Sequence, residues 1–597
     1  MPGYIGARMS SFATASASSS PATRPAKSFV AHAKLIGLLT LLSRVLGMAR
    51  ESVSAKYFGA GLVSSAFIVA FSIPNLFRKL FGEGALSAAF IPLYTKALKE
   101  GDVRSDSADG LTSTANDFAA ASVNLLCVML LLITVLGELV IWAVCHVAPH
   151  MRLDQLLTLK FTAIMLPYVL LICGTAFLSS ILQVHRRFGL PAFAPVLLNV
   201  IHIAVITLGA YFLHLQIKPR QKEFDPVTVA GQTTLAYWLS FFVLVAGVLQ
   251  VAILLPALRQ VGFRLRWVPH FWTPPVKQML KMSVPVALGA GVLQISVLMD
   301  KALSLMLAQS ADKAGHLIDT FHFFGRTVHY PMELGAAARL NWAQFLYQFP
   351  LGVFAIALAT AIFPGLSADA LDRDRSAFKA VLRQGVEATM FEGLAASVGL
   401  MIVALPAAKL LFQHGDLTPH DSQLIARSVV FYSSAIWAFS LLQITNRAYY
   451  ALHDTKTPLV MSIVNIAINL IVELPLIWLP GIGEAGMAVG TCVSFAIQAV
   501  IMLWILDRRI GGLELRRSAP SIIKMLGAAL VMGGVCLALQ RSPLYPRSET
   551  KTAWALQLIL IISAGAFVYL GICSAMGIEV LHHILPKRFR KPSPIRP

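Results

Sequence analysis

The sequence predicts an all-α polytopic membrane protein with about fourteen transmembrane helices. The 597 residues are 57% hydrophobic and only 13% charged, with a mean hydropathy of +0.70. Soluble proteins average roughly 45–50% apolar and 25% charged residues. Apolar runs of about 18–25 residues recur along nearly the whole chain, and one such run crosses the roughly 30 Å hydrocarbon core of a bilayer as a helix.

The predicted spans follow one another from residue 33 to residue 576, and each ends where its apolar run ends. They are 33–57, 62–82, 117–145, 156–183, 190–214, 232–256, 278–308, 341–366, 384–412, 426–452, 457–479, 484–506, 520–539 and 553–576. Residues 1–32 are rich in serine and lack the apolar core of a signal peptide, so they are expected to form a disordered cytosolic tail.

The positive charge is distributed according to membrane side. The formal net charge is +20, and an even number of spans places both termini on one side. Most basic loops fall on that side, including the basic tail 581–597, which makes it the cytosol. The segment 215–231 is a local exception. The charge is therefore explained by membrane lipids as neighbours, and no nucleic acid is predicted as a partner.

Two blocks of sequence recur in the same order, about 270 residues apart. Residues 181–204 resemble residues 443–465, and residues 71–93 resemble residues 347–366. Six spans separate the copies, so corresponding helices keep their direction as parallel repeats. We expect a six-helix lobe at 33–256, a second at 257–506 and two additional helices at 507–580, with a substrate between the lobes.

The first span carries three charged side chains, Arg44, Arg50 and Glu51. An arginine at a helix centre costs roughly 2.5–3.5 kcal/mol in hydrocarbon, so these residues should face a water-filled cavity. Ser43, Gly47 and Arg50 share one helix face. Arginine binds phosphate oxygens through two parallel hydrogen bonds, so the pattern favours a phosphate-bearing substrate.

Further polar residues in the spans are expected along the same gap. Arg78 lies between Pro74-Asn75 and Gly82-Glu83-Gly84, and an interrupted helix is tolerated in a membrane where it lines a cavity. In the seventh span, Asp300 is predicted to pair with a cavity cation, and Lys301 is its neighbour. Glu473 is expected to be a packed, hydrogen-bonded carboxylate.

Several function classes are disfavoured. A cation antiporter would need unpaired carboxylates in the cavity, and these are scarce. A membrane enzyme would need a convergent catalytic cluster or a phosphate-cradling loop, and no cytosolic segment carries one. The six cysteines and fifteen histidines lack metal-ligand spacing, so neither a metal nor a cofactor is predicted.

Specific motifs resemble a known family. The run from Ser43 to Glu51, then Ile73-Pro74-Asn75-Leu76-Phe77-Arg78 and Gly82-Glu83-Gly84, is similar to the amino-terminal signature of the MurJ (MviN-type) lipid II flippases. These belong to the multidrug/oligosaccharidyl-lipid/polysaccharide exporter superfamily. Family blocks continue in Phe188–Pro195 with Asn199, in Pro350–Ala361 and in Arg447–Pro458.

The resemblance implies a transporter, not an enzyme, in the cytoplasmic (inner) membrane of a bacterium. It would flip lipid II, the undecaprenyl-diphosphate-linked muropeptide of peptidoglycan synthesis, by alternating access through a cationic cavity. Substrate binding would fall to Ser43, Arg44, Arg50, Asn75, Arg78 and Glu83, with Glu83 orienting the arginines. The last two spans would border a groove for the lipid tail. A flippase for another polyprenyl-diphosphate-linked glycan is the alternative.

Two positions depart from the family pattern. Ser64-Ser65-Ala66-Phe67 stands where the family has Thr-Asp-Ala-Phe, and Ala343-Gln344-Phe345 stands where it has Ala-Asp/Glu-Arg. One charge of each sign is lost, so we expect Ser65 and Phe345 to face each other across the gap between the lobes. Lys301 and Arg339 are the candidates to replace the lost positive charge.

Overall fold

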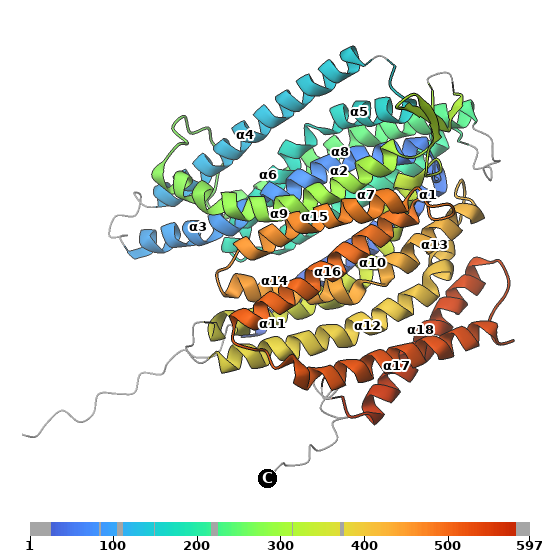
Figure 1. Cartoon of the computed structure of the whole chain (residues 1–597). Helices are drawn as coiled ribbons and strands as arrows, with labels where there is room; N and C mark the ends of the chain where they lie inside the picture. The colour runs from blue at the N-terminus through green and yellow to red at the C-terminus, as the bar shows by residue number, and fades with distance from the viewer. Residues whose placement is uncertain are drawn as a thin grey trace, which may run out of the picture.

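The computed structural model describes residues 26–82, 85–103, 112–148, 150–215, 225–312, 315–370, 375–578 and 580. Its first half contains α1 (Ala26–Phe58), α2 (Leu62–Phe77), the π-helix η1 (Arg78–Gly82), α3 (Ala85–Val103), α4 (Thr112–Val147), α5 (Leu153–Met165), α6 (Tyr168–Val184), α7 (Gly189–Phe212) and α8 (Pro226–Gln260). Figure 1 shows these helices running side by side along one bundle.

The second half begins with α9 (Pro274–Met306) and four short strands, β1 (Ser310–Ala311), β2 (Leu317–Ile318), β3 (Thr320–Phe323) and β4 (Arg326–His329). It continues with α10 (Ala336–Pro350), the π-helix η2 (Leu351–Ala355), α11 (Ile356–Asp369), α12 (Ser376–Phe412), α13 (Pro419–Ser433), α14 (Ile436–Ala451), α15 (Lys456–Leu476), α16 (Ala485–Arg509), α17 (Leu515–Arg541) and α18 (Lys551–Ala575). The strands pair as two antiparallel hairpins, β1–β2 and β3–β4.

Helices of membrane-spanning length and hydropathy confirm the predicted fold class. Among the described residues, α4, α7, α8, α12, α15, α16, α17 and α18 are each long and apolar enough to cross a membrane. The pairs α5–α6 and α13–α14 qualify together, each bent by 47° at a short break. All ten coincide with predicted spans. Many large apolar side chains on these helices are exposed, as expected for surfaces that contact lipid rather than water.

The four remaining predicted spans are the polar or interrupted ones. They correspond to α1, to α2 with η1, to α9, and to α10 with η2 and α11. Two boundaries differ from the prediction. Helix α1 already begins at Ala26, so residues 26–32 are helical rather than part of a disordered tail, and helix α3 follows the second span where no helix was predicted. The basic tail 581–597 lies outside the described residues.

The distortions of the helices recur as the predicted internal repeat requires. Helix α2 contains Pro74 and passes into η1, and helix α10 ends in Pro350 and passes into η2. The two bent pairs stand in equivalent positions of the halves and share the same 47° angle. Proline has no backbone N–H, so each helix loses one hydrogen bond, and the wider π-turn accommodates the irregularity. The same local cause therefore acts in both halves.

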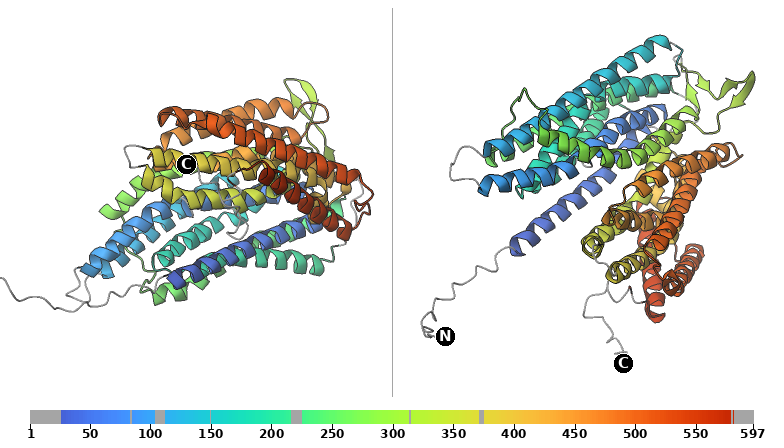
Figure 2. Two further views of the ribbon diagram at one scale, coloured as in Figure 1. Left: turned by 90° about the horizontal axis from the view of Figure 1, so that it is seen from below. Right: turned by 60° about the vertical axis from the view of Figure 1, so that its left-hand side comes forward.

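The buried apolar side chains form two large cores. One draws almost entirely on residues 58–279 and the other on residues 308–580. Figure 2 shows the corresponding groups of helices, which we call the N-lobe (α1–α8) and the C-lobe (α10–α18). Helix α9 packs against α2 and α3 of the N-lobe as well as α10 and α15 of the C-lobe. It therefore bridges the two cores.

Candidate functional site: a cationic cavity between the lobes

A cavity of about 650 Å³ lies between the N-lobe and the C-lobe. Its walls come from α1, α2, η1 and α7 on one side and from α9, α10, η2, α11 and α14 on the other. All four of the polar or interrupted predicted spans contribute to it. Among the described residues, the lining includes five cationic side chains and a single carboxylate, namely Arg44, Arg50, Arg78, Lys79, Lys301 and Glu51.

The face predicted for the first helix does point into this cavity. Ser43, Gly47 and Arg50 all line it, together with Arg44. A Cβ added at Gly47 would stand 3.8 Å from Phe345 Cζ of α10, so this glycine faces the opposite lobe. Among the described residues, no hydrogen-bond or ion-pair partner is found for the Arg44 guanidinium, which lies against the backbone of Gly352 in η2.

Arg50 and Glu51 begin a chain of polar contacts that crosses from one lobe to the other. The Arg50 guanidinium donates to Glu51 Oε1 at 2.6 Å. The other carboxylate oxygen of Glu51 accepts from Trp342 Nε1 at 3.2 Å and from Asn341 Nδ2 at 3.4 Å. The single cavity carboxylate is therefore held by an N-lobe arginine and two C-lobe donors.

The same chain continues to Lys301 on α9. Its ammonium group donates to Asn341 Oδ1 and to Ser72 Oγ, both at 2.9 Å. These two hydrogen-bond partners are neutral oxygens, and Ser72 belongs to the N-lobe helix α2. Lys301 carries its charge into the wall opposite Arg44 and Arg50, so cations of both sides face the same space.

Arg78 opens the π-helix η1, which confirms that the helix is interrupted at this residue. Arg78 and the adjacent Lys79 both line the cavity. Neighbours in a regular α-helix point about 100° apart, and π-turns are frequent at functional sites. Asn75, one turn earlier, also lines the cavity and donates to the Phe71 carbonyl oxygen at 3.1 Å. Glu83 lies outside the described residues.

Ser65 does not face the central cavity, so the expected pairing with Phe345 is wrong. Ser65 is 3% exposed and borders a separate small void beside Leu305 and Gly335, near the end of α9. Phe345 lines the central cavity. The two substitutions relative to the family pattern thus lie in different places, because Ser65 occupies the face of α2 that packs against its neighbours.

Asp300 is likewise not part of the cavity lining, and the predicted pairing with a cavity cation is wrong. Its carboxylate accepts from Asn469 Nδ2 at 3.0 Å, and the same amide donates to Glu473 Oε2 at 3.1 Å. Consecutive residues on a helix point about 100° apart, so Lys301 enters the cavity while Asp300 enters the contact between α9 and α15. Glu473 is a packed, hydrogen-bonded carboxylate, as predicted.

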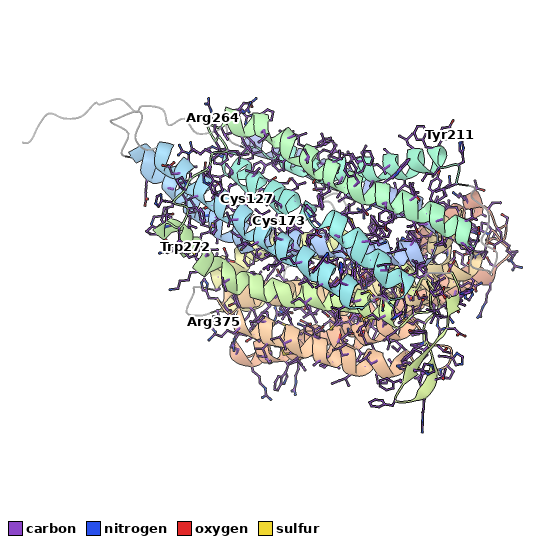
Figure 3. The ribbon with its side chains drawn as sticks, turned by 90° about the horizontal axis from the view of Figure 1, so that it is seen from above. Cys127, Cys173, Tyr211, Arg264, Trp272 and Arg375 are labelled. Carbon is purple, nitrogen blue, oxygen red and sulfur yellow. The ribbon has the colours of Figure 1, made fainter. Side chains whose placement is uncertain are left out.

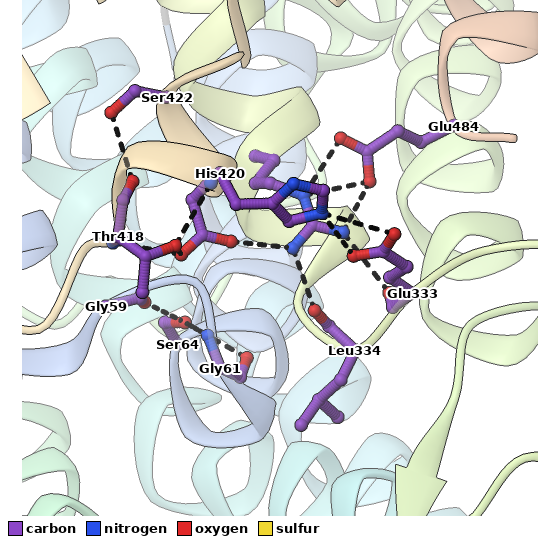
Figure 4. A network of polar contacts seen from close by, with 11 residues as sticks. Gly59, Gly61, Ser64, Glu333, Leu334, Thr418, His420, Ser422 and Glu484 are labelled. Carbon is purple, nitrogen blue, oxygen red and sulfur yellow. Dashed lines mark hydrogen bonds and ion pairs between the residues drawn. The ribbon is translucent and has the colours of Figure 1, made fainter. Parts of the chain in front are cut away.

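Arg339 forms a buried ion network inside the C-lobe, and Figure 4 labels its partners Glu484 and Leu334. The side chain is 1% exposed, and it contacts Glu484 Oε2 at 2.6 Å and Asp421 Oδ1 at 3.0 Å. It also donates to the Leu334 carbonyl oxygen at 2.8 Å. Of the two candidates for the lost positive charge, only Lys301 therefore lies in the cavity.

The lobes touch at the end of the bundle away from the chain ends, where the helices converge in Figure 2. Ser52 Oγ donates to the Leu411 carbonyl oxygen at 2.6 Å, and His414 Nε2 lies 3.0 Å from the Ser52 carbonyl oxygen. The Asp416 amide donates to the Lys56 carbonyl oxygen at 3.0 Å. We call these interlobe bonds the far-side contacts.

Two further interactions belong to the far-side contacts. Gln232 Nε2 donates to Asp416 Oδ2 at 2.6 Å. Arg152 of the N-lobe donates to the carbonyl oxygens of Met306 and Ala308 at 2.9 Å, near the end of α9. A cation near a helix C-terminus is favoured by the helix dipole. Backbone approaches backbone here, since Gly335 stands directly against the Ala60 carbonyl group.

The family model described as lipid II flippase MurJ matches residues 54–565 of the chain. The chain belongs to the MurJ family. A protein of Burkholderia cenocepacia named lipid II flippase MurJ is 30% identical over 513 residues, which cover 83% of this chain and 87% of that protein. A probable lipid II flippase MurJ of Rhizobium tropici is 29% identical over 572 residues, covering 94% and 96%.

Solved structures agree with MurJ-type architecture. The structure described as lipid II flippase MurJ in an inward closed conformation matches with a TM-score of 0.67 at 20% identity, covering 92% of this chain and 99% of that one. An inward-facing multidrug transporter of the MATE family, in the MOP superfamily, matches with a TM-score of 0.59 at 14% identity, covering 81% and 99%. At these identities the two matches establish the fold.

Proposed function

We propose that this MurJ family member flips lipid II from the inner to the outer leaflet by alternating access through its cationic cavity. The observation that carries the proposal is the convergence of five cations on one interlobe space in which Glu51 is the single carboxylate among the described residues. Like charges gathered in a cavity repel one another unless an anion neutralises them. A substrate bearing a diphosphate supplies that anion.

The chemistry of the lining suits a diphosphate in particular. Arg44, Arg50 and Arg78 offer planar forks of N–H donors that match phosphate oxygens, and Lys301 adds a point charge from the other wall. Arg44 has no partner among the described residues, so its donors are free for a ligand. Ser43 and Asn75 supply smaller polar groups on the same walls. We assign these residues to the substrate site.

Alternating access is supported by the asymmetry of the contacts between the lobes. The far-side contacts join the lobes at one end, while the cavity occupies the space between their helices. A small number of hydrogen bonds makes up the far-side contacts, and each neutral bond contributes about 0.5–1.5 kcal/mol to the closed arrangement. A substrate that binds one arrangement better than the other shifts such a balance.

The lipid tail would remain in the membrane while the head group crosses. Helices α17 and α18 pack against α12 and against each other, outside the cavity lining. Their exposed apolar side chains, among them Ile523, Leu530 and Phe567, offer a surface compatible with a polyprenyl chain. We therefore retain the assignment of the last two helices to the tail groove.

Two other substrates are distinguishable by experiment. Another polyprenyl-diphosphate-linked glycan shares the diphosphate, so growth of a strain depleted of its lipid II flippase separates the two. A cation or drug antiporter would need a free carboxylate in the cavity, and the only cavity carboxylate among the described residues, Glu51, is already held by Arg50 and Trp342. The lining therefore argues against an antiporter, and complementation decides between the two diphosphate-linked substrates.

Complementation with cavity variants tests the proposal. Arg44→Ala, Arg50→Ala and Arg78→Ala should each fail to support a flippase-depleted strain at normal membrane levels. Each removes charged hydrogen bonds worth about 1.5–3 kcal/mol. Arg50→Lys should restore function only in part, because lysine cannot form the paired bonds. The exposed Arg264 in the connection between α8 and α9 provides the control, and Arg264→Ala should complement. Growth with all three cavity variants would contradict the assignment.

The proposal also includes an orientation. Both termini should lie in the cytosol, and the far side should face the periplasm. A reporter fused after Pro597 that fluoresces only in the cytosol should be bright, and a periplasm-specific reporter at the same place should be silent. The reverse pattern would invert the direction of transport that we propose.

A further inference from the structure

The hairpin formed by β3 and β4 carries an exposed aromatic tip. The strands pair Thr320 with His329, Phe321 with Val328, His322 with Thr327 and Phe323 with Arg326. Phe324 and Gly325 form the two-residue turn. Phe323 is 58% exposed and Phe324 is 90% exposed, so neither aromatic ring is buried by the protein.

The turn itself is strained. Phe324 has φ of +48° and Gly325 has φ of +74°. Two-residue hairpin turns of this type favour Asn-Gly or Asp-Gly, because both central residues need positive φ and a large side chain is penalised there. At 90% exposure, Phe324 gains little packing within the protein to offset that penalty. A contact with another molecule therefore explains a phenylalanine at position 324 better than packing within the protein does.

The two faces of the hairpin differ in polarity. Side chains alternate along a strand and cross-strand partners share a face. Phe321, Phe323 and Val328 therefore lie on one face with Arg326, whereas the opposite face carries Thr320, His322, Thr327 and His329. The hairpin is amphipathic, with three apolar side chains and one cation on a single face.

The aromatic face is continuous with the membrane-facing surface of α15. The Phe321 ring lies 6.3 Å from the ring of Trp478, which follows the last residues of α15 and is 43% exposed. From Phe321 the aromatic contacts continue to Phe323 at 6.5 Å and then to Phe324 at 4.6 Å between ring centroids. The exposed residues of α15, including Ile463 and Ile471, lie on one of the helices apolar enough to span a membrane.

The hairpin also projects sideways from the bundle. In Figure 3, which looks along a direction perpendicular to that of Figure 1, its strands extend beyond the edge of the neighbouring helices near one end of the bundle. The right-hand view of Figure 2 shows it protruding at the end away from the chain termini. It therefore extends beyond the outline of the helices at this end of the bundle.

We propose that the β3–β4 hairpin is a membrane-surface element whose aromatic face inserts into the boundary between head groups and acyl chains, on the side of the membrane away from the chain termini. Amphipathic elements that lie at this boundary bury phenylalanine, tryptophan and leucine on their apolar face, and tryptophan, as at position 478, is enriched there. Arg326 lies beside Phe323 on the inserted face, where it meets lipid phosphate, and the histidine-bearing face remains in water. This inference is independent of the transported substrate.

Photocrosslinking tests the proposal in the full-length protein. The photoreactive residue p-benzoylphenylalanine replaces Phe324 in one variant and Thr327, on the polar face near the tip, in a matched control. Both are reconstituted into vesicles of phosphatidylethanolamine and phosphatidylglycerol and irradiated. Mass spectrometry should find a phospholipid adduct at position 324 and several-fold less at position 327. Equal labelling, no lipid adduct at 324, or an adduct to a second protein chain would overturn the proposal.

A second measurement covers the case in which the photoreactive group perturbs the turn. Phe324→Asn relieves the strain and keeps the hairpin, since asparagine accepts positive φ. Amide hydrogen exchange of residues 320–329 should be slower in lipid vesicles than in detergent for the unmodified protein. In Phe324→Asn combined with Phe323→Ser this difference should disappear. Retention of the difference in the double variant would exclude insertion of the two aromatic rings.

Discussion

Gly335→Ala should open the far side of the protein. A Cβ added at Gly335 would stand well inside 3.0 Å of the Ala60 carbonyl group, which belongs to the other lobe. The Ala60 carbonyl is backbone and cannot rotate away as a flexible side chain can. Either the lobes separate by about 1 Å, or the closed arrangement keeps the overlap. Overpacking of this kind costs about 1–3 kcal/mol.

The strain of the positive φ at Gly335 must be separated from the clash. Gly335 has φ of +90°, and Gly262 has φ of +80° with no atom within 4 Å of an added Cβ. Gly262→Ala therefore carries the backbone strain without the overlap and is the matched control. A difference of 1–3 kcal/mol between the closed and open arrangements corresponds to about a 5- to 150-fold shift in their ratio.

Thiol accessibility measures that ratio. Ser65 is 3% exposed and borders the same small void as Gly335, so Ser65→Cys is expected to react slowly with a membrane-impermeant maleimide. Gly335→Ala should raise the labelling rate within the range above, and Gly262→Ala should leave it unchanged. Equal rates in the two alanine variants would refute the reasoning that the Gly335–Ala60 approach holds the far side closed.

Three further predictions concern single side chains. Lys301→Met should weaken lipid II binding to the purified protein about tenfold or more, because charged hydrogen bonds are worth about 1.5–3 kcal/mol; unchanged affinity would remove Lys301 from the site. Burial, followed by the charges of Lys551 and Lys56, lowers the pKa of His414 to about 4 in the closed arrangement. The neutral imidazole is therefore the form that closure favours. Closure is fully stabilised above about pH 6.5, the ordinary pKa of histidine, and weakens as the pH falls towards 4. The thiolate fraction itself falls with pH, so the labelling of Ser65→Cys is divided by that of a fully exposed control cysteine at the same pH. This ratio should rise over that range, and the rise should be absent in His414→Gln. Arg339→Gln should lower thermal stability strongly, since breaking a buried ion pair costs about 3–5 kcal/mol, and a melting temperature equal to that of the unmodified protein would contradict this.

The spans could be predicted from sequence because hydrocarbon imposes a length and a composition on each helix. The sequence also singles out Arg44, Arg50 and Arg78, because a charged side chain inside a span is costly unless it faces a polar cavity. Which way a buried polar residue points was harder to judge. Asp300 and Lys301 are adjacent in the chain, yet one enters a helix contact and the other the cavity. That choice depends on how α9 rotates against α2 and α15, which no local pattern encodes.

Other features left weaker traces in the sequence. The two hairpins between α9 and α10 consist of short strands in a long connection. The β3–β4 turn is formed by Phe324 and Gly325, and a phenylalanine is unusual at this position. Most of the far-side contacts end on backbone carbonyl oxygens, which carry no compositional signal. The glycines at 335 and 415 were the available hint, because both adopt positive φ and both approach the opposite lobe closely.

The polarity of the spans that line the cavity has a consequence for biosynthesis. Helix α1 carries Arg44 and Arg50, η1 begins with Arg78 and Lys79, and α9 carries Lys301, so these segments bring cations into the membrane. Each arginine near a span centre adds roughly 2.5–3.5 kcal/mol to the cost of leaving the translocon for lipid. We therefore expect these three segments to enter the membrane beside apolar neighbours, such as α7 for α1. Insertion of this chain is then expected to be cooperative, because the apolar helices offset the cost of the charged ones.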